Sequence, residues 1–129
     1  MKDSIFVFGS NTAGVHGAGA ALTAYQKHGA RHGIGYGLCG QSFAIPTKDK
    51  FIQTLSIRQV EQFVAGFLAF ARDRDDLDFM VTRIGCGLAG FSDEEMARLF
   101  VWATPNCFFD TKWVEYLPID QGIKFWGTF

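Results

Sequence analysis

Glycine is concentrated in three stretches of this chain, and two of these stretches directly follow short, largely apolar runs. Twelve of the fifteen glycines fall within residues 9–19, 29–40 and 85–90. The runs Ile5–Phe8 and Phe79–Ile84 precede the first and third stretches and have the apolar character of strands buried on both faces. A buried strand that ends in a glycine loop is typical of α/β proteins whose ligands lie beyond the strand ends.

Helical patterns follow both of these loops and also lie between them. Residues 18–27 are small residues and helix formers, so a helix is expected near the end of the first loop. Ser56 and Ser92 each stand three residues before a glutamine or glutamate, the spacing of a capping box. These boxes, with apolar residues at intervals of three and four, predict helices over about 57–72 and 93–103. Short strands are expected at 42–46 and 113–117.

Strands that alternate with helices at this spacing predict an α/β fold with mainly parallel pairing. We therefore expect a three-layer α/β/α sandwich around a mixed, mainly parallel sheet. The 129 residues fit one domain, spanning 1–129. Hydrophobic residues make up 48% and charged residues 19% of the chain, a composition that excludes a disordered protein.

Charge and cysteine content limit the partners and the location. The formal net charge of -1 gives no overall attraction for nucleic acid or anionic lipid, so an anionic ligand must be bound by local groups. The three cysteines lack CxxC spacing and no secretory leader precedes the first strand, which predicts a cytoplasmic protein with free thiols. No apolar run approaches the ~20 residues that cross a bilayer, and His28 and His32 lack metal-site spacing. We expect no membrane span, metal or cofactor.

The glycine loops after the strands are expected to bind phosphate or pyrophosphate. Exposed amides at helix starts favour anions, and glycine lets the backbone approach phosphate oxygens closely. Gly14, Gly17 and Gly19 give the spacing GxxGxG rather than the dinucleotide fingerprint GxGxxG, and no GK[ST] tripeptide is present. The pattern therefore favours neither a Rossmann site nor an NTPase phosphate loop. The alternative is that these glycines only form tight turns.

Two sequence motifs resemble the macrodomain family. IFVFGSNTAGVHGAGAAL, at 5–22, resembles the first ligand loop of that family. VTRIGCGLAGF, at 81–91, with SDEEMARLF after it, is similar to the phosphate-binding loop of macrodomains related to ADP-ribose phosphate phosphatases and ADP-ribosyl hydrolases. The resemblance covers about residues 4–117. It implies a minimal macrodomain-like fold that binds ADP-ribose or a close derivative.

The same resemblance implies the residues that would surround the ligand. They are Asn11, Gly17, Gly19, Ala20, Gly85, Cys86, Gly87, Leu88, Ala89, Gly90 and Phe91. Asn11 would lie beside the distal ribose, Ala20 would begin the supporting helix, and Phe91 would cover the distal sugar. The family recognises the adenine amino group with an acidic residue in an additional N-terminal segment. Here Asp3 or a residue of the aromatic C-terminus would have to take that role.

Two ionisable side chains are the candidates for catalysis. His16 lies inside the first glycine loop, and imidazole exchanges protons near neutral pH. Lys48 resembles the lysine nucleophile of one hydrolase branch of the family. That branch has an aspartate where this chain has Ala89, so His16 ranks ahead of Lys48. The thiol of Cys86 is expected to pack rather than react.

Three functions remain open at this point. The first is a module that binds ADP-ribose. The second is a hydrolase that removes a phosphate or an ADP-ribosyl group from such a ligand. The third is a module that binds single-stranded RNA or nucleotides by stacking bases on Phe and Trp. These patterns make no prediction about the oligomeric state.

Overall fold

A six-stranded sheet forms the centre of the protein, in a computed structural model that describes residues 3–118 and 121–129. Its strand order is β2-β3-β1-β4-β5-β6. All neighbouring strands run parallel except β2 and β3, so the predicted mixed, mainly parallel sheet is confirmed. The strands are β1 (Asp3–Asn11), β2 (Gly37–Cys39), β3 (Ser42–Lys48), β4 (Leu77–Val81), β5 (Cys107–Asp110) and β6 (Lys124–Gly127).

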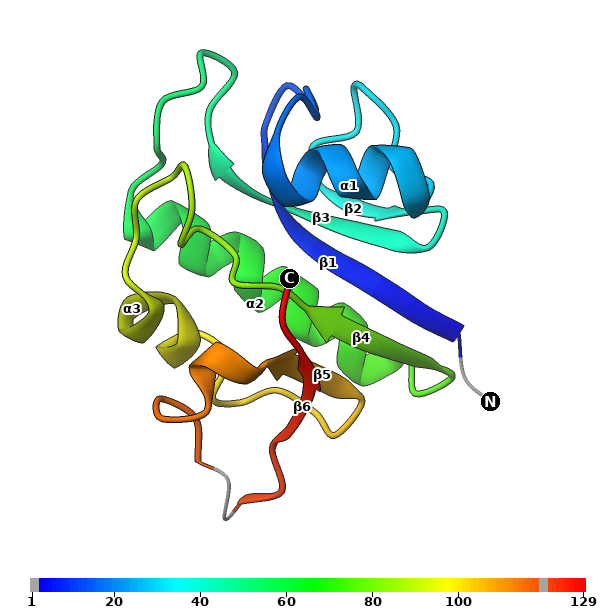
Figure 1. Cartoon of the computed structure of the whole chain (residues 1–129), viewed down its shortest axis with the longest axis vertical. Helices are drawn as coiled ribbons and strands as arrows, with labels where there is room; N and C mark the ends of the chain where they lie inside the picture. The colour runs from blue at the N-terminus through cyan, green and yellow to red at the C-terminus, as the bar shows by residue number, and fades with distance from the viewer. Residues whose placement is uncertain (1–2, 119–120) are drawn as a thin grey trace.

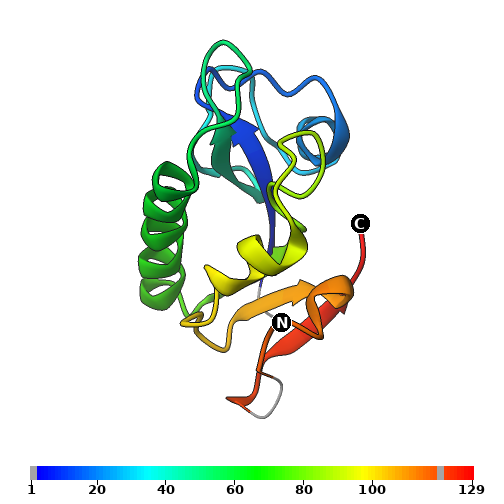
Figure 2. The same ribbon diagram turned by 90° about the vertical axis from the view of Figure 1, so that its left-hand side faces the viewer.

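Helices cover both faces of this sheet. They are α1 (Gly19–Lys27), α2 (Ile57–Asp73), α3 (Asp93–Arg98) and the 3₁₀ turn η1 (Thr111–Trp113). α1 and α2 lie on opposite sides of the sheet (Figures 1 and 2), which makes three layers, as predicted. Within the described ranges, no helix combines the length and apolar character needed to cross a membrane.

The central strand β1 divides the core into two clusters. Ile5 and Val7 point into the larger cluster, shared with α2 and α3. Phe6 and Phe8 point into the smaller one, together with Ala24 of α1. Successive strand side chains point to opposite faces, so a run of four apolar residues is needed when both faces are covered. β1 is therefore fixed from both sides, which gives the loop after it a rigid base.

Both predicted capping boxes are present, and they set the starts of α2 and α3. In each box the serine side chain accepts from the backbone N–H three residues on, and that residue's side chain accepts in return. α2 ends at Asp73, close to the expected position, but α3 ends at Arg98 rather than near 103. The segment after α3 continues as tight turns, with Ala103 N–H donating to Phe100 O. Pro105 follows, and a proline ends helical structure before it.

The strand expected at 113–117 is wrong. Trp113 is the last residue of η1, and the side chain of Asp110 caps this turn by accepting from Lys112 N–H at 2.9 Å. The indole of Trp113 is fully buried because it packs against Phe100 and Phe109. The apolar pattern of this segment thus comes from a turn that packs on the core. The strands that the sequence analysis missed are β2, β5 and β6.

Candidate functional site

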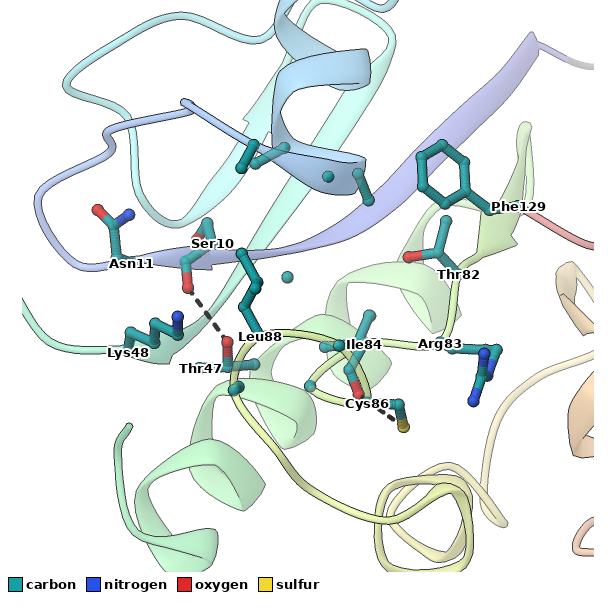
Figure 3. Close-up of a pocket in the computed structure, with 18 of the residues that line it drawn as sticks. Ser10, Asn11, Thr47, Lys48, Thr82, Arg83, Ile84, Cys86, Leu88 and Phe129 are labelled. Carbon is teal, nitrogen blue, oxygen red and sulfur yellow. Dashed lines mark hydrogen bonds between the residues drawn. The ribbon is translucent and has the colours of Figure 1, made fainter. Parts of the chain in front are cut away.

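A cavity of about 460 Å³ lies at the carboxyl ends of β1, β3 and β4 (Figure 3). β1 and β4 are adjacent and parallel, so the glycine loops that follow them meet at the same edge of the sheet. The cavity is lined by ten of the thirteen site residues expected from the sequence. These are Asn11, Gly17, Gly19, Ala20, Lys48, Gly85, Cys86, Gly87, Leu88 and Ala89.

The first glycine loop is shaped by the side chain of Asn11. Its Nδ2 donates to Val15 O at 2.8 Å, and its Oδ1 accepts from Val15 N–H at 3.0 Å. Both ends of the amide therefore bind the loop itself, which identifies Asn11 as a residue that shapes the loop. Beyond this turn, Gly17 faces open space, with no atom within 4 Å of a Cβ built there.

The glycines at 29–40 support this loop instead of lining the cavity. A Cβ on Gly14 would lie 2.5 Å from Gly33 C, so the two backbones can pack together only without a side chain there. Gly14 also has a φ of 72°, a region that favours glycine. The hydroxyl of Ser10 donates to Gly35 O and joins the same two segments. Gly29 and Gly40 also approach each other closely, because a Cβ on Gly40 would lie 2.9 Å from Gly29 Cα.

The second glycine loop is a compact turn between β4 and α3. Phe91 N–H donates to Gly85 O at 2.9 Å, and Gly90 N–H donates to Gly87 O at 3.1 Å. A Cβ on Gly87 would have no atom within 4 Å, so this backbone is open to the cavity. The hydroxyl of Thr54 donates to Ala89 O at 3.0 Å and restrains the loop from the other side.

Phe91 and Gly90 do not line the cavity. The ring of Phe91 lies against Gly85 and packs on the core, so the expectation that it covers the distal sugar is corrected. A bulky ring beneath a loop excludes water from its inner side, whereas a cover over the ligand would have to project from the outer side. Phe91 therefore acts as a support for the loop.

An ion pair fixes the second loop at its base. Arg83 donates to both carboxylate oxygens of Asp93, at 2.7 and 2.6 Å, and Trp113 Nε1 donates to Asp93 Oδ1 at 2.8 Å. The hydrogen bonds from Arg83 lower the pKa of Asp93 to about 2. Burial raises the pKa of the nearby Cys86 thiol to about 12. A thiol that stays protonated is a poor nucleophile, which supports the expected packing role of Cys86.

His16 is placed away from the cavity, which corrects the expectation that it faces the ligand. Its ring is buried, lies edge-on to Phe8 and stacks on His32 with centroids 5.7 Å apart. Nε2 lies 2.9 Å from Arg31 O, and Nδ1 is a buried atom without a hydrogen-bond partner. Loss of contact with water therefore lowers the pKa of His16 below 6.5. The residue supports the first glycine loop from behind.

We expect acid to destabilise the protein through this histidine. In the unfolded chain, His16 binds a proton near pH 6.5. In the folded protein the pKa of His16 is lowered, so the same proton binds only at a lower pH. Stability should therefore fall as the pH drops through that value. We expect the thermal midpoint of unfolding to fall between about pH 7.5 and about pH 5.5, and to fall less in His16→Gln, which titrates no proton there. An equal fall in both proteins would contradict this role. It would assign the loss of stability to a group that both proteins share, such as His28, whose pKa is also lowered.

Asp110 and Phe129 line the end of the cavity opposite Lys48. Phe129 belongs to the aromatic C-terminus that the sequence offered for adenine recognition, whereas Asp110 was not assigned. Asp110 is fully buried at the end of β5, and its Oδ2 accepts from Thr128 Oγ1 at 3.1 Å and from Phe129 N–H at 3.2 Å. Phe129 lies beside Thr82 (Figure 3) and edge-on to Phe6. Asp3 starts β1, at the far end from the cavity. No sequence signal joined Asp110 to Phe129, because their proximity depends on β5 and β6.

The described residues contain no group of three or more His, Cys, Asp or Glu side chains arranged to bind a metal ion. The charged groups that line the cavity are Lys48, Arg83 and Asp110. Arg83 is paired with Asp93, so the glycine backbone and Lys48 are the described lining groups available to an anionic ligand. The site is therefore suited to a ligand that is bound mainly through N–H donors.

Comparison with known proteins supports the fold. No protein-family model matches the chain, and no curated protein matches it either. The chain is similar to the solved structure of a protein of unknown function from Bacteroides thetaiotaomicron, with a TM-score of 0.60 at 16% sequence identity. That similarity covers 99% of this chain and 88% of the other. It identifies the class as a mixed α/β sandwich, and at this identity it shows the fold alone.

Proposed function

We propose that this protein is macrodomain-like and that it binds ADP-ribose or a close derivative in the cavity between its two glycine loops. One observation supports this most strongly: two glycine-rich loops that are far apart in the sequence lie at the carboxyl ends of adjacent parallel strands and line the same cavity. Ligands of open α/β sheets occupy this position, and the open backbone at Gly17 and Gly87 suits close contact with phosphate.

The start of α1 supports a diphosphate at this position. No side chain caps its N-terminus at Ala18, and its first turn contains no acidic residue. The first N–H groups of a helix lack partners within the helix and favour negative charge. Because Gly19 and Ala20 line the cavity, these groups can donate to phosphate oxygens. The diphosphate would then lie between the start of α1 and the loop at 85–90.

The base would lie beside Phe129 and Asp110. An aromatic ring at one end of the cavity offers a surface on which a base can stack. Asp110 holds this ring in place, because its buried carboxylate accepts from Thr128 Oγ1 and from Phe129 N–H. The ribose farther from the base would then lie toward Lys48, at the opposite end in Figure 3.

Calorimetric titration with ADP-ribose, AMP, ribose 5-phosphate and a short single-stranded oligonucleotide tests this function. We expect one saturable site for ADP-ribose, weaker binding of AMP and ribose 5-phosphate, and no binding of the oligonucleotide. AMP retains the base and one phosphate, whereas ribose 5-phosphate lacks the base, so the pair separates the two ends of the site. Binding of the oligonucleotide alone would favour the nucleic-acid module instead.

Hydrolysis of a phosphate or an ADP-ribosyl group is a second candidate activity, favoured by the position of Lys48 in the cavity lining. His16 does not line the cavity, so the ranking expected from the sequence is reversed. We expect Lys48→Arg to lower any turnover by ~100 to 10,000-fold while ADP-ribose still binds, because guanidinium keeps the charge but does not deprotonate. Release of phosphate from ADP-ribose phosphate and of ADP-ribose from modified protein would be measured. Turnover that survives in Lys48→Arg would exclude the lysine as the reacting group.

We also propose a cytoplasmic location. Cys39, Cys86 and Cys107 are all free thiols, and a reducing compartment keeps cysteines in this form.

A further inference from the structure

Three apolar side chains from three different loops surround the cavity at the end near Lys48. Val15 is 53% exposed, Ile52 is 49% exposed and Leu88 is 77% exposed, and all three line the cavity. We call these three residues the apolar rim. A single exposed apolar side chain is ordinary, but several around one cavity indicate a binding surface. None of the interactions proposed above for the diphosphate or the first base uses these side chains.

The backbone at Ile52 has a strained conformation, and the residue lines the cavity. Its φ is 63°, a left-handed conformation that a β-branched residue rarely adopts. Asp49 fixes it, because its Oδ1 accepts from Phe51 N–H at 2.8 Å and from Gln53 N–H at 3.0 Å. Strained residues of this kind persist where surrounding contacts impose them, and they cluster at ligand sites.

The other two members of the rim are also on restrained loops. Asn11 binds both backbone groups of Val15. The hydroxyl of Thr54, two residues after Ile52, donates to Ala89 O, next to Leu88. The loop of Val15 is joined to the end of β3 by Thr12 N–H, which donates to Lys48 O at 3.0 Å. The rim is therefore formed by three loops that hydrogen bonds connect to one another or to β3. In Figure 3, Leu88 stands over the cavity with Lys48 and Asn11 on one side and Phe129 on the other.

We infer that the apolar rim binds an uncharged, flat ring carried on the second ribose, so that the preferred ligand is a dinucleotide with a ring at each end of its diphosphate. This inference rests on the proposed function, which places the first base at Phe129. A flat ring can bury both of its faces against branched aliphatic side chains, which removes apolar surface from water. Lys48 lines the same end of the cavity, so its positive charge disfavours a cationic ring there.

NADH, NAD+ and ADP-ribose separate these features in one calorimetric series. All three share the adenosine diphosphate portion. NADH adds an uncharged ring, NAD+ adds a cationic ring of the same size, and ADP-ribose has no second ring. We expect NADH to bind about tenfold tighter than ADP-ribose, the factor that corresponds to burying on the order of 60 Å² of apolar surface. NAD+ should bind more weakly than NADH.

Two variants of the same loop provide the matched test. Ile52→Asn removes the aliphatic side chain, and asparagine tolerates the left-handed backbone, so the loop should keep its shape. We expect the ratio of the ADP-ribose and NADH dissociation constants to fall about two- to threefold, the share of one of the three rim side chains, because Val15 and Leu88 remain. Phe51→Ser removes a neighbouring ring that is 71% exposed and does not line the cavity, so this ratio should not change.

The possible results separate this inference from the function on which it rests. If ADP-ribose binds but NADH binds no tighter, or if Ile52→Asn leaves the ratio unchanged, the ring site is wrong and the ADP-ribose site stands. If NAD+ binds as tightly as NADH, the requirement for an uncharged ring is wrong. If none of the three ligands binds the folded protein, both the proposed function and this inference are overturned.

Discussion

Phe67→Ala is expected to lower the free energy of unfolding by about 3 to 5 kcal/mol, the usual cost of emptying a buried phenylalanine site. The ring is fully buried on α2 and contacts rings from three other segments. Its centroid lies 5.1 Å from that of Phe43, 5.3 Å from that of Phe79 and 6.3 Å from that of Phe100. The substitution leaves a cavity where α2, the sheet and the segment after α3 meet.

Chemical denaturation monitored by circular dichroism measures this effect. Phe51→Ala is the matched control, because that ring is exposed and lies under the ammonium group of Lys50, 5.2 Å from its centroid. Its stability should stay within about 0.5 kcal/mol of the parent protein. Equal stability of Phe67→Ala and Phe51→Ala would mean that the packing of α2 on the sheet is described wrongly.

Gly87→Val is expected to reduce ADP-ribose affinity on the order of 100-fold or more while the protein stays folded. The backbone at Gly87 does not require a positive φ, and a Cβ there meets no atom within 4 Å, so valine can be accommodated in the empty protein. The new side chain then occupies space that the diphosphate needs. Hydrogen bonds to charged groups contribute about 1.5 to 3 kcal/mol each, so losing two of them gives this factor.

The size of the side chain at position 87 gives an internal control. Gly87→Ala adds one methyl group and should weaken binding less than Gly87→Val, while both variants should unfold at temperatures near that of the parent. Calorimetry gives the affinities and thermal denaturation checks the fold. If Gly87→Val is folded and binds ADP-ribose as tightly as the parent, the assignment of this loop to the diphosphate is wrong.

Local patterns in the sequence predicted the parts of the fold that depend on near neighbours. The four apolar residues of β1, the two capping boxes and the glycine loops are each recognisable within about ten residues. Adjacent parallel strands then bring the two loops to one sheet edge, so ten of the thirteen residues expected at the site do line the cavity. Phe67 is buried as the periodicity of α2 indicates.

The remaining parts depend on contacts between distant residues. β2, β5 and β6 contain only three or four residues each, too few for a periodic pattern to show. Without β5 and β6, the position of Asp110 beside Phe129 could not be predicted. His16 stands in a glycine loop, where histidine is usually exposed, but here the glycine stretch at 29–40 covers it through His32 and Arg31. Only tertiary packing distinguishes these two environments.

Amide chemical-shift mapping by nuclear magnetic resonance during an ADP-ribose titration tests directly whether the two glycine loops bind this ligand. Glycine amides appear in a separate region of the spectrum, so the loops can be followed individually. We expect the largest shifts at Gly17, Gly19, Gly85 and Gly87, which line the cavity, and no shifts at Gly122 and Gly66, which do not. Saturable shifts confined to residues outside the two loops, or no shifts in the folded protein, would mean that the ligand does not bind between these loops.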